Sequence, residues 1–281
     1  MHSAPITRTH KAAFVILIDR SGSMAEEVVF QGRTTTKAEA LAEAVNSLLE
    51  EIINRSRRER YVGDYFDVAI LGYGGEGVES LLGSGFKSIV DVDTMDTPTT
   101  NRLVCHTLPS GKSFSTIVER RCWVEPQASG KTPMGEALKR ARRMVAAWCR
   151  KHPESHPPIV INISDGEATD ATHQEITTLA EGIKRCGTND GEVLLMNIHL
   201  ACEHDTPSPA LRFPTESTPL PVNRHSQLLY DISSTLPPLY NASVAELRGE
   251  EPPFRAVCYN APIDDLVGLL AIGSLSMDQM I

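Results

Sequence analysis

An apolar run that breaks into one carboxylate and two hydroxyls stands at residues 14–24, FVILIDRSGSM. Five successive apolar residues without polar alternation predict a strand covered on both faces, as parallel strands in α/β proteins are. Asp19, Ser21 and Ser23 follow at alternate positions, so an extended or gently turning backbone lets their oxygens converge on one side. Gly22 permits a close approach of other atoms. The stretch therefore predicts a buried strand with oxygen ligands at its carboxyl end.

Two later stretches end in similar polar groups. Residues 130–135, GKTPMG, open a helical pattern and place Thr132 in the loop before it. Residues 159–166, IVINISDG, form a second apolar run that ends in Asp165. Each stretch alone has an ordinary explanation, because threonine before proline is typical of a helix N-cap and Asp-Gly is a common turn dipeptide. Asp-x-Ser alone is likewise typical of a turn at a strand end.

Taken jointly, the three elements resemble the metal-ion-dependent adhesion site of von Willebrand factor A (VWA) domains. Ser-Gly-Ser-Met is the commonest wording of the first element in that family, and the order of the elements also agrees. The wording is closest to bacterial intracellular VWA proteins, including those encoded with tellurite-resistance and phosphatase or kinase partners. The resemblance implies a metal site formed by Asp19, Ser21, Ser23, Thr132 and Asp165.

The alternation of strand and helix patterns predicts an α/β fold. The expected elements lie at residues 14–18, 38–53, 65–71, 134–148, 159–164, 171–185 and 193–200, with Asp170 as a helix N-cap. They predict a doubly wound, mainly parallel central sheet with helices on both faces, to which the resemblance adds one antiparallel edge strand. We expect a single VWA domain over residues 1–281, with a core at about 12–200, an elaborated insertion at 72–131 and a C-terminal extension at 203–281 that completes the sheet edge.

Weaker patterns mark the remaining segments. Residues 26–35 are expected to form a polar connection, and an edge hairpin is expected within the insertion. A short helix at 225–232, a last edge strand at 254–259 and a final helix at 264–272 complete the prediction.

Composition is that of an ordinary soluble globular protein, with 41% hydrophobic and 22% charged residues. A formal net charge of -9 argues against a nucleic-acid-binding surface and is compatible with a divalent cation. The first residues lack the apolar core of a signal peptide, and no apolar run approaches the length of a membrane span. We therefore expect a cytoplasmic protein whose six scattered cysteines are reduced.

The five candidate ligands are all oxygen donors, which favours Mg²⁺, with Mn²⁺ or Ca²⁺ as alternatives. The resemblance implies that the hydroxyls bind the ion directly, that Asp19 and Asp165 act largely through water, and that an Asp or Glu of a partner protein takes the open position. We therefore expect a metal-dependent protein-binding module in a bacterial stress-response or tellurite-resistance type of system, and not an enzyme.

Alternative functions remain open. A Mg²⁺-dependent phosphatase of the haloacid-dehalogenase type also carries an Asp after its first strand, but Ser21 stands where the acid/base Asp of that family would lie. A scaffold with an internally capped metal is another alternative. The acids that could cap it are Glu79, Asp91, Asp93 and Asp96. A zinc site at His199, Cys202 and His204 would lack a second ligand pair with the usual spacing.

Overall fold

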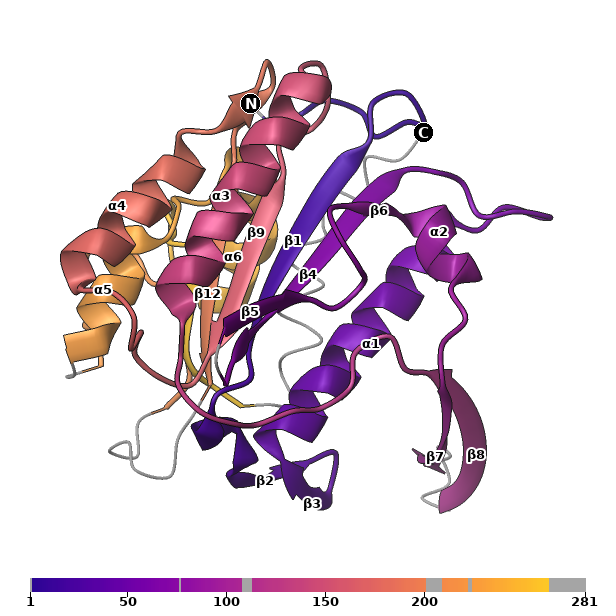
Figure 1. Ribbon diagram of the computed structural model, residues 1–281. Helices are drawn as coiled ribbons and strands as arrows, with labels where there is room; N and C mark the ends of the chain where they lie inside the picture. Colours follow the sequence, from indigo (N-terminus) through magenta and orange to yellow (C-terminus); the bar gives the residue numbers. More distant parts are fainter. Residues whose placement is uncertain (1, 76, 108–112, 201–208, 222–223, 263–281) are drawn as a thin grey trace.

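A mainly parallel sheet forms the centre of the computed structural model, which describes residues 2–75, 77–107, 113–200, 209–221 and 224–262. Its strands lie in the order β13-β14-β12-β9-β1-β4-β5, and β6 also pairs with β4 (Figure 1). The strands are β1 Ala12–Asp19, β4 Phe66–Gly74, β5 Gly77–Ser80, β6 Lys87–Ser88, β9 Ile159–Ser164, β12 Leu194–Leu200, β13 Leu211–Arg212 and β14 Val257–Ala261. Antiparallel pairing occurs at β5, β6 and β13, and all the other pairs are parallel. The expected α/β fold is confirmed.

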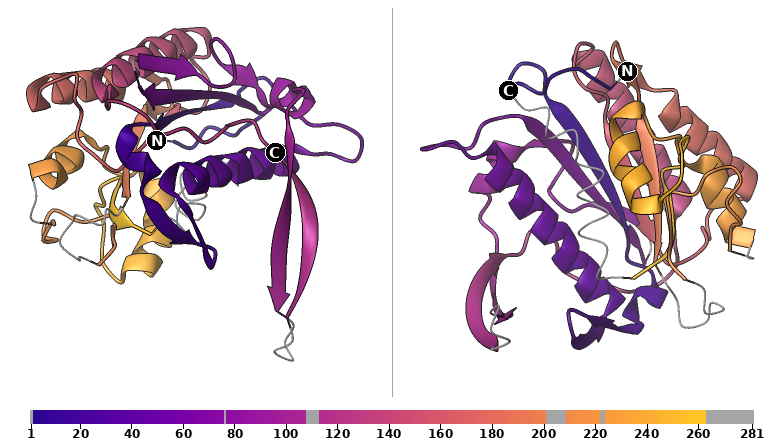
Figure 2. Two further views of the ribbon diagram at one scale, coloured as in Figure 1. Left: turned by 60° about the horizontal axis from the view of Figure 1, so that its bottom comes forward. Right: turned by 180° about the vertical axis from the view of Figure 1, so that it is seen from behind.

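Helices cover both faces of this sheet (Figures 1 and 2). One face carries α1 Lys37–Ser56, α2 Ile89–Thr94 and α6 Pro238–Arg248, and the other carries α3 Met134–Lys151, α4 His173–Lys184 and α5 Arg224–Ile232. In β1, Phe14, Ile16 and Ile18 point into the first core, and Val15 and Leu17 point into the second. This two-sided burial explains why the strand sequence is uniformly apolar.

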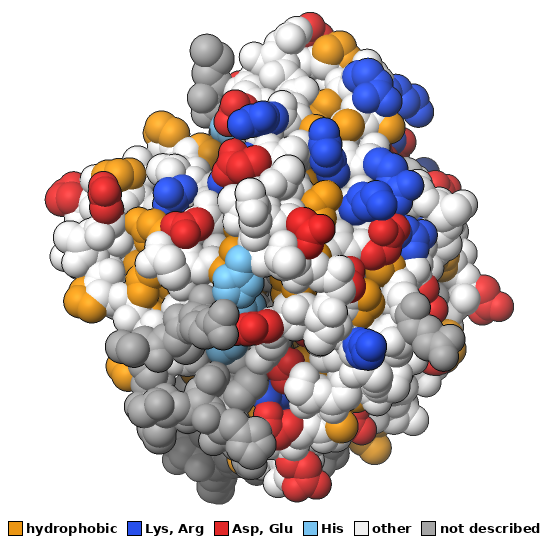
Figure 3. Space-filling view, turned by 60° about the vertical axis from the view of Figure 1, so that its left-hand side comes forward, with side chains coloured by type: hydrophobic (Ala, Val, Ile, Leu, Met, Phe, Trp, Pro, Cys, Tyr) orange, Lys and Arg blue, Asp and Glu red, His pale blue; other side chains and the backbone are white. Residues whose placement is uncertain are grey.

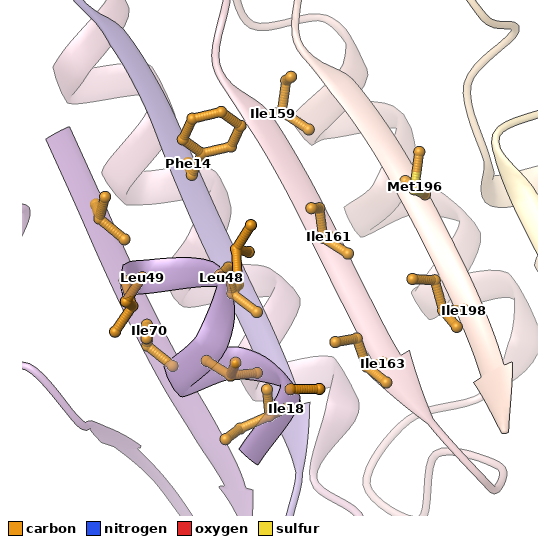
Figure 4. Packing of buried hydrophobic residues seen from close by; sticks show 14 of the residues in the cluster. Phe14, Ile18, Leu48, Leu49, Ile70, Ile159, Ile161, Ile163, Met196 and Ile198 are labelled. Atoms are coloured by element: carbon orange, nitrogen blue, oxygen red, sulfur yellow. The ribbon is translucent and has the colours of Figure 1, made fainter. Parts of the chain in front are cut away.

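Close packing between α1 and the sheet fixes the first core. Leu48 and Leu49 of α1 lie over Phe14, Ile18 and Ile70 (Figure 4). All five side chains are at most 3% exposed.

The solvent-exposed surface on the other side of the molecule carries many charged side chains. Figure 3 shows Lys and Arg side chains interspersed with Asp and Glu there, as expected for a solvated helical surface.

The chain reverses its direction of winding between β1 and β9. After β1 the chain adds β4 and β5 on one side, and from β9 onward it adds strands on the other side. Open α/β sheets place their ligands in the crevice outside the carboxyl ends of the strands at such a reversal. This position is where β1 ends at Asp19 and β9 ends at Ser164.

Among the described residues, three strand pairs lie outside the central sheet. β2 Glu27–Phe30 pairs with β3 Arg33–Thr36, so residues 27–36 form a hairpin instead of the irregular polar connection that we expected. Gln31 and Gly32 make its turn, and both have a positive φ, as two-residue hairpin loops require. β7 Thr99–Thr107 and β8 Ser113–Arg121 form a two-stranded sheet that projects from the body (Figure 2), and β10 Gly187–Thr188 pairs with β11 Gly191–Glu192.

Several boundaries differ from the sequence prediction. Helix α6 was not expected. The strand expected at 254–259 is β14, which begins later and lies between β12 and β13, so its expected place at the edge of the sheet is wrong. Helix α4 begins after Thr172, which forms a capping box, so the assignment of Asp170 as its cap is wrong. The final helix expected at 264–272 lies outside the described residues. In the part of the chain that the structure describes, no helix has the length and apolar character needed to cross a membrane.

Candidate metal centre

Two buried carboxylates meet where the neighbouring strands β1 and β9 end. Asp19 is the last residue of β1, and Asp165 follows β9 directly. The strands are parallel and pair up to Ile18 opposite Ile163, so both acids emerge at the same edge of the sheet. Asp19 is 1% exposed and Asp165 is 5% exposed. Two carboxylates that are buried away from bulk water require hydrogen-bond donors or cations around them.

A chain of hydrogen bonds connects the two carboxylates. Asp19 Oδ1 accepts from the Ser21 backbone N–H at 2.8 Å, and the Ser21 and Ser23 hydroxyl oxygens lie 3.1 Å apart. Ser23 Oγ donates to Asp165 Oδ1 at 2.7 Å. Because the single hydroxyl hydrogen of Ser23 is donated to Asp165, the Ser21 hydroxyl is the donor in the hydrogen bond between the two serines. Ser23 is placed for this by a single 3₁₀ turn at Gly22–Ala25. The structure thus brings four of the five candidate ligands together.

Thr132, the fifth candidate, is placed by the loop that contains it. The Gly22 N–H donates to the Gly130 carbonyl at 3.1 Å, which ties this loop to the serine loop. The Thr132 backbone N–H donates to Thr169 Oγ1 at 3.0 Å, and the Thr132 carbonyl accepts from the Thr169 N–H at 3.0 Å. Thr132 is 7% exposed. It therefore lies between the loop that carries the serines and the segment that follows Asp165.

Asp170 supports the same loop from the other side. Its two carboxylate oxygens accept from the backbone N–H groups of Gly135 and Glu136, each at 2.9 Å. N–H groups in the first turn of a helix have no acceptor within the helix, so Asp170 acts as an anionic partner of the N-terminus of α3. The segment after β9 therefore fixes both Thr132 and the helix that begins behind it.

Glycines allow the loops to approach one another. A Cβ added at Gly74 would lie 2.3 Å from the Arg20 carbonyl oxygen, a distance that real Cβ atoms do not reach. Gly130 has a φ of +66°, and a Cβ there would lie 2.6 Å from the Gly75 Cα. The Arg20 carbonyl in turn accepts from the Ser129 N–H at 2.8 Å. The Arg20 backbone, directly after Asp19, thus lies tightly packed between β4 and the loop that carries Thr132.

Asp19 is held in an environment that disfavours its charge. Burial raises the pKa of Asp19 above its ordinary value, hydrogen bonds from Ser164 and Ser21 oppose this, and the charge of Asp165 adds to the rise. Ser164 Oγ donates to Asp19 Oδ2 at 2.6 Å. Nearby, burial raises the pKa of the Tyr73 hydroxyl, and the Asp19 charge contributes. Negative charge is therefore costly here unless a cation is present.

Two supporting residues were missed by the sequence analysis. Ser164 orients Asp19, and its only signal was a hydroxyl directly before Asp165. Lys37 is 1% exposed, and its ammonium lies 3.2 Å from Asp165 Oδ2 and also pairs with Glu26. A lysine at the start of an amphipathic helix is ordinarily assigned to solvent, so the sequence carried no signal for its burial.

The donor set fits a hard divalent cation. Two carboxylates and three hydroxyls are the oxygen ligands that Mg²⁺ and Ca²⁺ prefer. Among the described residues, no group of three or more His, Cys, Asp and Glu side chains could hold a metal, so an ion at this place depends on the hydroxyls. Of the alternative zinc ligands, His199 lies in β12, and Cys202 and His204 lie outside the described residues.

Three of the acids considered as internal caps have other partners. Glu79 pairs with Arg20. Asp91 accepts from the Ser88 N–H and so forms part of the capping box of α2. Asp93 pairs with Arg121 at 2.9 Å. The fourth acid, Asp96, is exposed.

A first prediction concerns Asp19→Asn in the metal-free protein. Because the folded-state pKa of Asp19 lies above its unfolded value, the ionised carboxylate lowers stability above that pKa, and this cost disappears as the pH falls and the proton binds. In EDTA at neutral pH, Asp19→Asn should therefore melt at a higher temperature than the wild type. The difference should shrink as the pH is lowered toward the ordinary aspartate range.

Asp190 provides a control of opposite sign. Burial there is outweighed by hydrogen bonds from the Ala4 and Ser3 backbone amides, so the pKa of Asp190 is lowered. Asp190→Asn should lower the melting temperature at neutral pH. If Asp19→Asn also lowered it, the account of a strained, uncompensated charge at Asp19 would be wrong.

A second prediction tests the close approach at Gly74. Gly74→Ala should push the Arg20 backbone away and displace Asp19, which costs about 1–3 kcal/mol of stability and weakens divalent-cation binding at least about tenfold. Gly77→Ala on the neighbouring strand is the matched control, since a Cβ there meets nothing within 4 Å. Denaturant unfolding and titration calorimetry on both variants measure the two effects, and equal cation affinities would contradict the prediction.

Comparisons with known proteins place the chain near VWA structures at low similarity. No family model and no curated protein matches it. A solved structure described as von Willebrand factor type A from Catenulispora acidiphila is 15% identical, with 69% of this chain and 34% of that chain covered and a TM-score of 0.41. The vWF domain of the type V pili tip protein Mfa5 from Porphyromonas gingivalis is 16% identical, with 58% and 43% covered and a TM-score of 0.35. An uncharacterized membrane spanning protein from Vibrio fischeri is 13% identical, with 86% and 89% covered and a TM-score of 0.29.

The chain thus spans about a third of the length of the Catenulispora structure and less than half of the Mfa5 domain. Likeness at this level concerns the fold alone.

Proposed function

We propose that this chain is a metal-dependent protein-binding module, which takes Mg²⁺ between the ends of β1 and β9 and binds an aspartate or glutamate of a partner protein. One observation carries the proposal: hydrogen bonds join the buried residues Asp19, Ser21 and Asp165 to the exposed Ser23 in a single cluster, where the winding of the sheet reverses. The residues that would hold the ion are Asp19, Ser21, Ser23, Thr132 and Asp165.

The residues around the cluster would keep these oxygens in position. The Ser164 hydroxyl and the Ser21 N–H fix both oxygens of Asp19. The link between Gly22 and Gly130 keeps the Thr132 loop beside the serines. Bound Mg²⁺ supplies positive charge and retains exchangeable water positions, one of which a carboxylate from outside can take. The protein's own part is therefore to hold ligands on one side and leave the solvent side open.

An apolar side chain near the site supports a role in protein binding. The β2–β3 hairpin follows the serine loop directly and projects at the end of the sheet where the candidate site lies (Figure 1). Val29 on this hairpin is 65% exposed. Protein interfaces combine such apolar contacts with a few specific polar ones. A partner that brings a carboxylate to the ion would also be able to cover Val29.

Binding, and not turnover, is what the arrangement supports. Ser21 stands where a phosphatase of the haloacid-dehalogenase type would have its acid. The bacterial stress-response or tellurite-resistance setting and the cytoplasmic location rest on the sequence and stay predictions.

A third prediction is that the purified protein binds about one Mg²⁺ or Mn²⁺ per chain. Ser23→Ala should weaken this binding at least about tenfold, because it removes a ligand and the donor to Asp165. Thr178→Ala is a matched control, since this hydroxyl lies on the exposed side of α4 and bonds only to the backbone of its own helix. Calorimetry measures both. Absence of heat from the wild type at millimolar concentrations of either ion would overturn the proposed function.

A fourth prediction concerns the partner. Proteins captured from the native lysate in Mg²⁺ should be released by EDTA, and once a partner is identified, Asp19→Ala should weaken its affinity by about 2–5 kcal/mol, the usual cost of losing a desolvated charge contact. Lys139→Ala, on the exposed side of α3, should leave the affinity unchanged. A partner that binds Asp19→Ala and the wild type equally would show that binding occurs elsewhere.

A further inference from the structure

Lys37 is a buried cation in direct contact with the candidate metal site. Its Nζ lies 3.2 Å from Asp165 Oδ2, and the Lys37 side chain is 1% exposed while that of Asp165 is fully buried. The same ammonium pairs with the Glu26 carboxylate. We propose that Lys37 is a built-in counter-ion that neutralises Asp165 in the metal-free protein and competes with a divalent cation for that carboxylate. This inference rests on the proposed metal site.

The local structure around Lys37 does not favour its burial. It is the first residue of α1, where a positive charge is opposed by the helix dipole. Removing an ammonium from water costs several kcal/mol, which only close carboxylates can offset. Its backbone N–H donates to the Glu26 carbonyl at 3.0 Å, so Glu26 holds Lys37 through both main chain and side chain. The lysine is therefore positioned by the site and not by the helix.

The Lys37 ammonium and the neutral donors bind different carboxylates of the site. Asp165 receives the Lys37 ammonium at Oδ2 and the Ser23 hydroxyl at Oδ1. Asp19 is held by neutral donors, the Ser21 N–H and the Ser164 hydroxyl. Together, Asp19, Asp165, Glu26 and Lys37 carry a formal charge of -2, which one divalent ion would balance.

Two opposite effects follow from this placement. Without a metal, the ammonium reduces the repulsion between the carboxylates and keeps the loops together. When a metal is bound, the same ammonium is a like charge a few ångströms away and lowers the affinity for the cation. Neighbouring charges shift a pKa by one to three units through the same electrostatic repulsion. Lys37 would thus make the site well formed when empty and weak in its affinity for Mg²⁺.

The test compares Lys37→Gln with the wild type. Glutamine keeps a hydrogen-bond donor but removes the charge, so the Kd for Mg²⁺ should fall about tenfold or more, since one pKa unit corresponds to a factor of ten. The melting temperature in EDTA should fall, and the rise on adding Mg²⁺ should exceed that of the wild type. Lys37→Met, which removes the donor as well, should show both effects.

Lys11→Gln is the matched control. Lys11 lies just before the start of β1, at the opposite end of the strand, and also pairs with two carboxylates, Asp64 at 2.6 Å and Asp67 at 3.3 Å. Its loss should lower the melting temperature while the Kd for Mg²⁺ stays at the wild-type value. A change in Kd in this variant would show that net charge, and not contact with Asp165, governs cation binding, which would overturn the inference.

The outcomes separate this inference from the proposed function. Equal Kd values in the wild type and both Lys37 variants would overturn competition and leave the metal site standing. Binding by the variants but not by the wild type would support competition and refute a metal-dependent wild type. No binding by any of them would refute both. Failure of both variants to fold, even at saturating Mg²⁺, would show that the ammonium is purely structural and would overturn competition.

Discussion

Burial of two carboxylates at the ends of adjacent parallel strands is the constraint on which the surrounding structure depends. Asp19 and Asp165 cannot be solvated by bulk water, so the protein supplies hydroxyls, a backbone amide and an ammonium instead. Each donor comes from a segment that needs its own support. The serine turn is tied to Gly130, and the lysine is tied to Glu26. The loops at this end of the sheet are therefore shaped by the need to compensate buried charge.

The central sheet could be predicted because burial on both faces leaves an unambiguous mark on the sequence. The run that became β1 is apolar from Ala12 to Ile18, and β9 is polar only at Asn162 and Ser164, since α1 packs on one side and α3 on the other. The resemblance to the VWA adhesion site predicted that Asp19, Ser21, Ser23 and Asp165 would meet, and the pairing of β1 with β9 is what brings Asp165 to the other three. The spacing of Asp19, Ser21 and Ser23 predicted by itself only that the oxygens of these three residues converge.

What could not be predicted depends on contacts between distant segments. Asp170 lies before α4 and has the residue type of an N-cap, yet it binds the first turn of α3, some 35 residues earlier. Lys37 begins an amphipathic helix and has the residue type of a solvated side chain, but its ammonium is buried in an ion pair with Asp165. The β2–β3 hairpin has a polar strand, Arg33–Thr36, whose periodicity gave no strand signal. In each case the tertiary partner overrides the local preference.

The bond from Ser23 to Asp165 joins residues 142 positions apart, and that from Ser164 to Asp19 joins residues 145 apart. Such contacts close long loops, and the entropic cost of closing a loop grows with the number of residues that it encloses. The oxygen cluster therefore does not exist in a chain whose first half alone has folded. A cation that binds this cluster recognises the completed sheet, so its affinity reports whether β9 has docked beside β1.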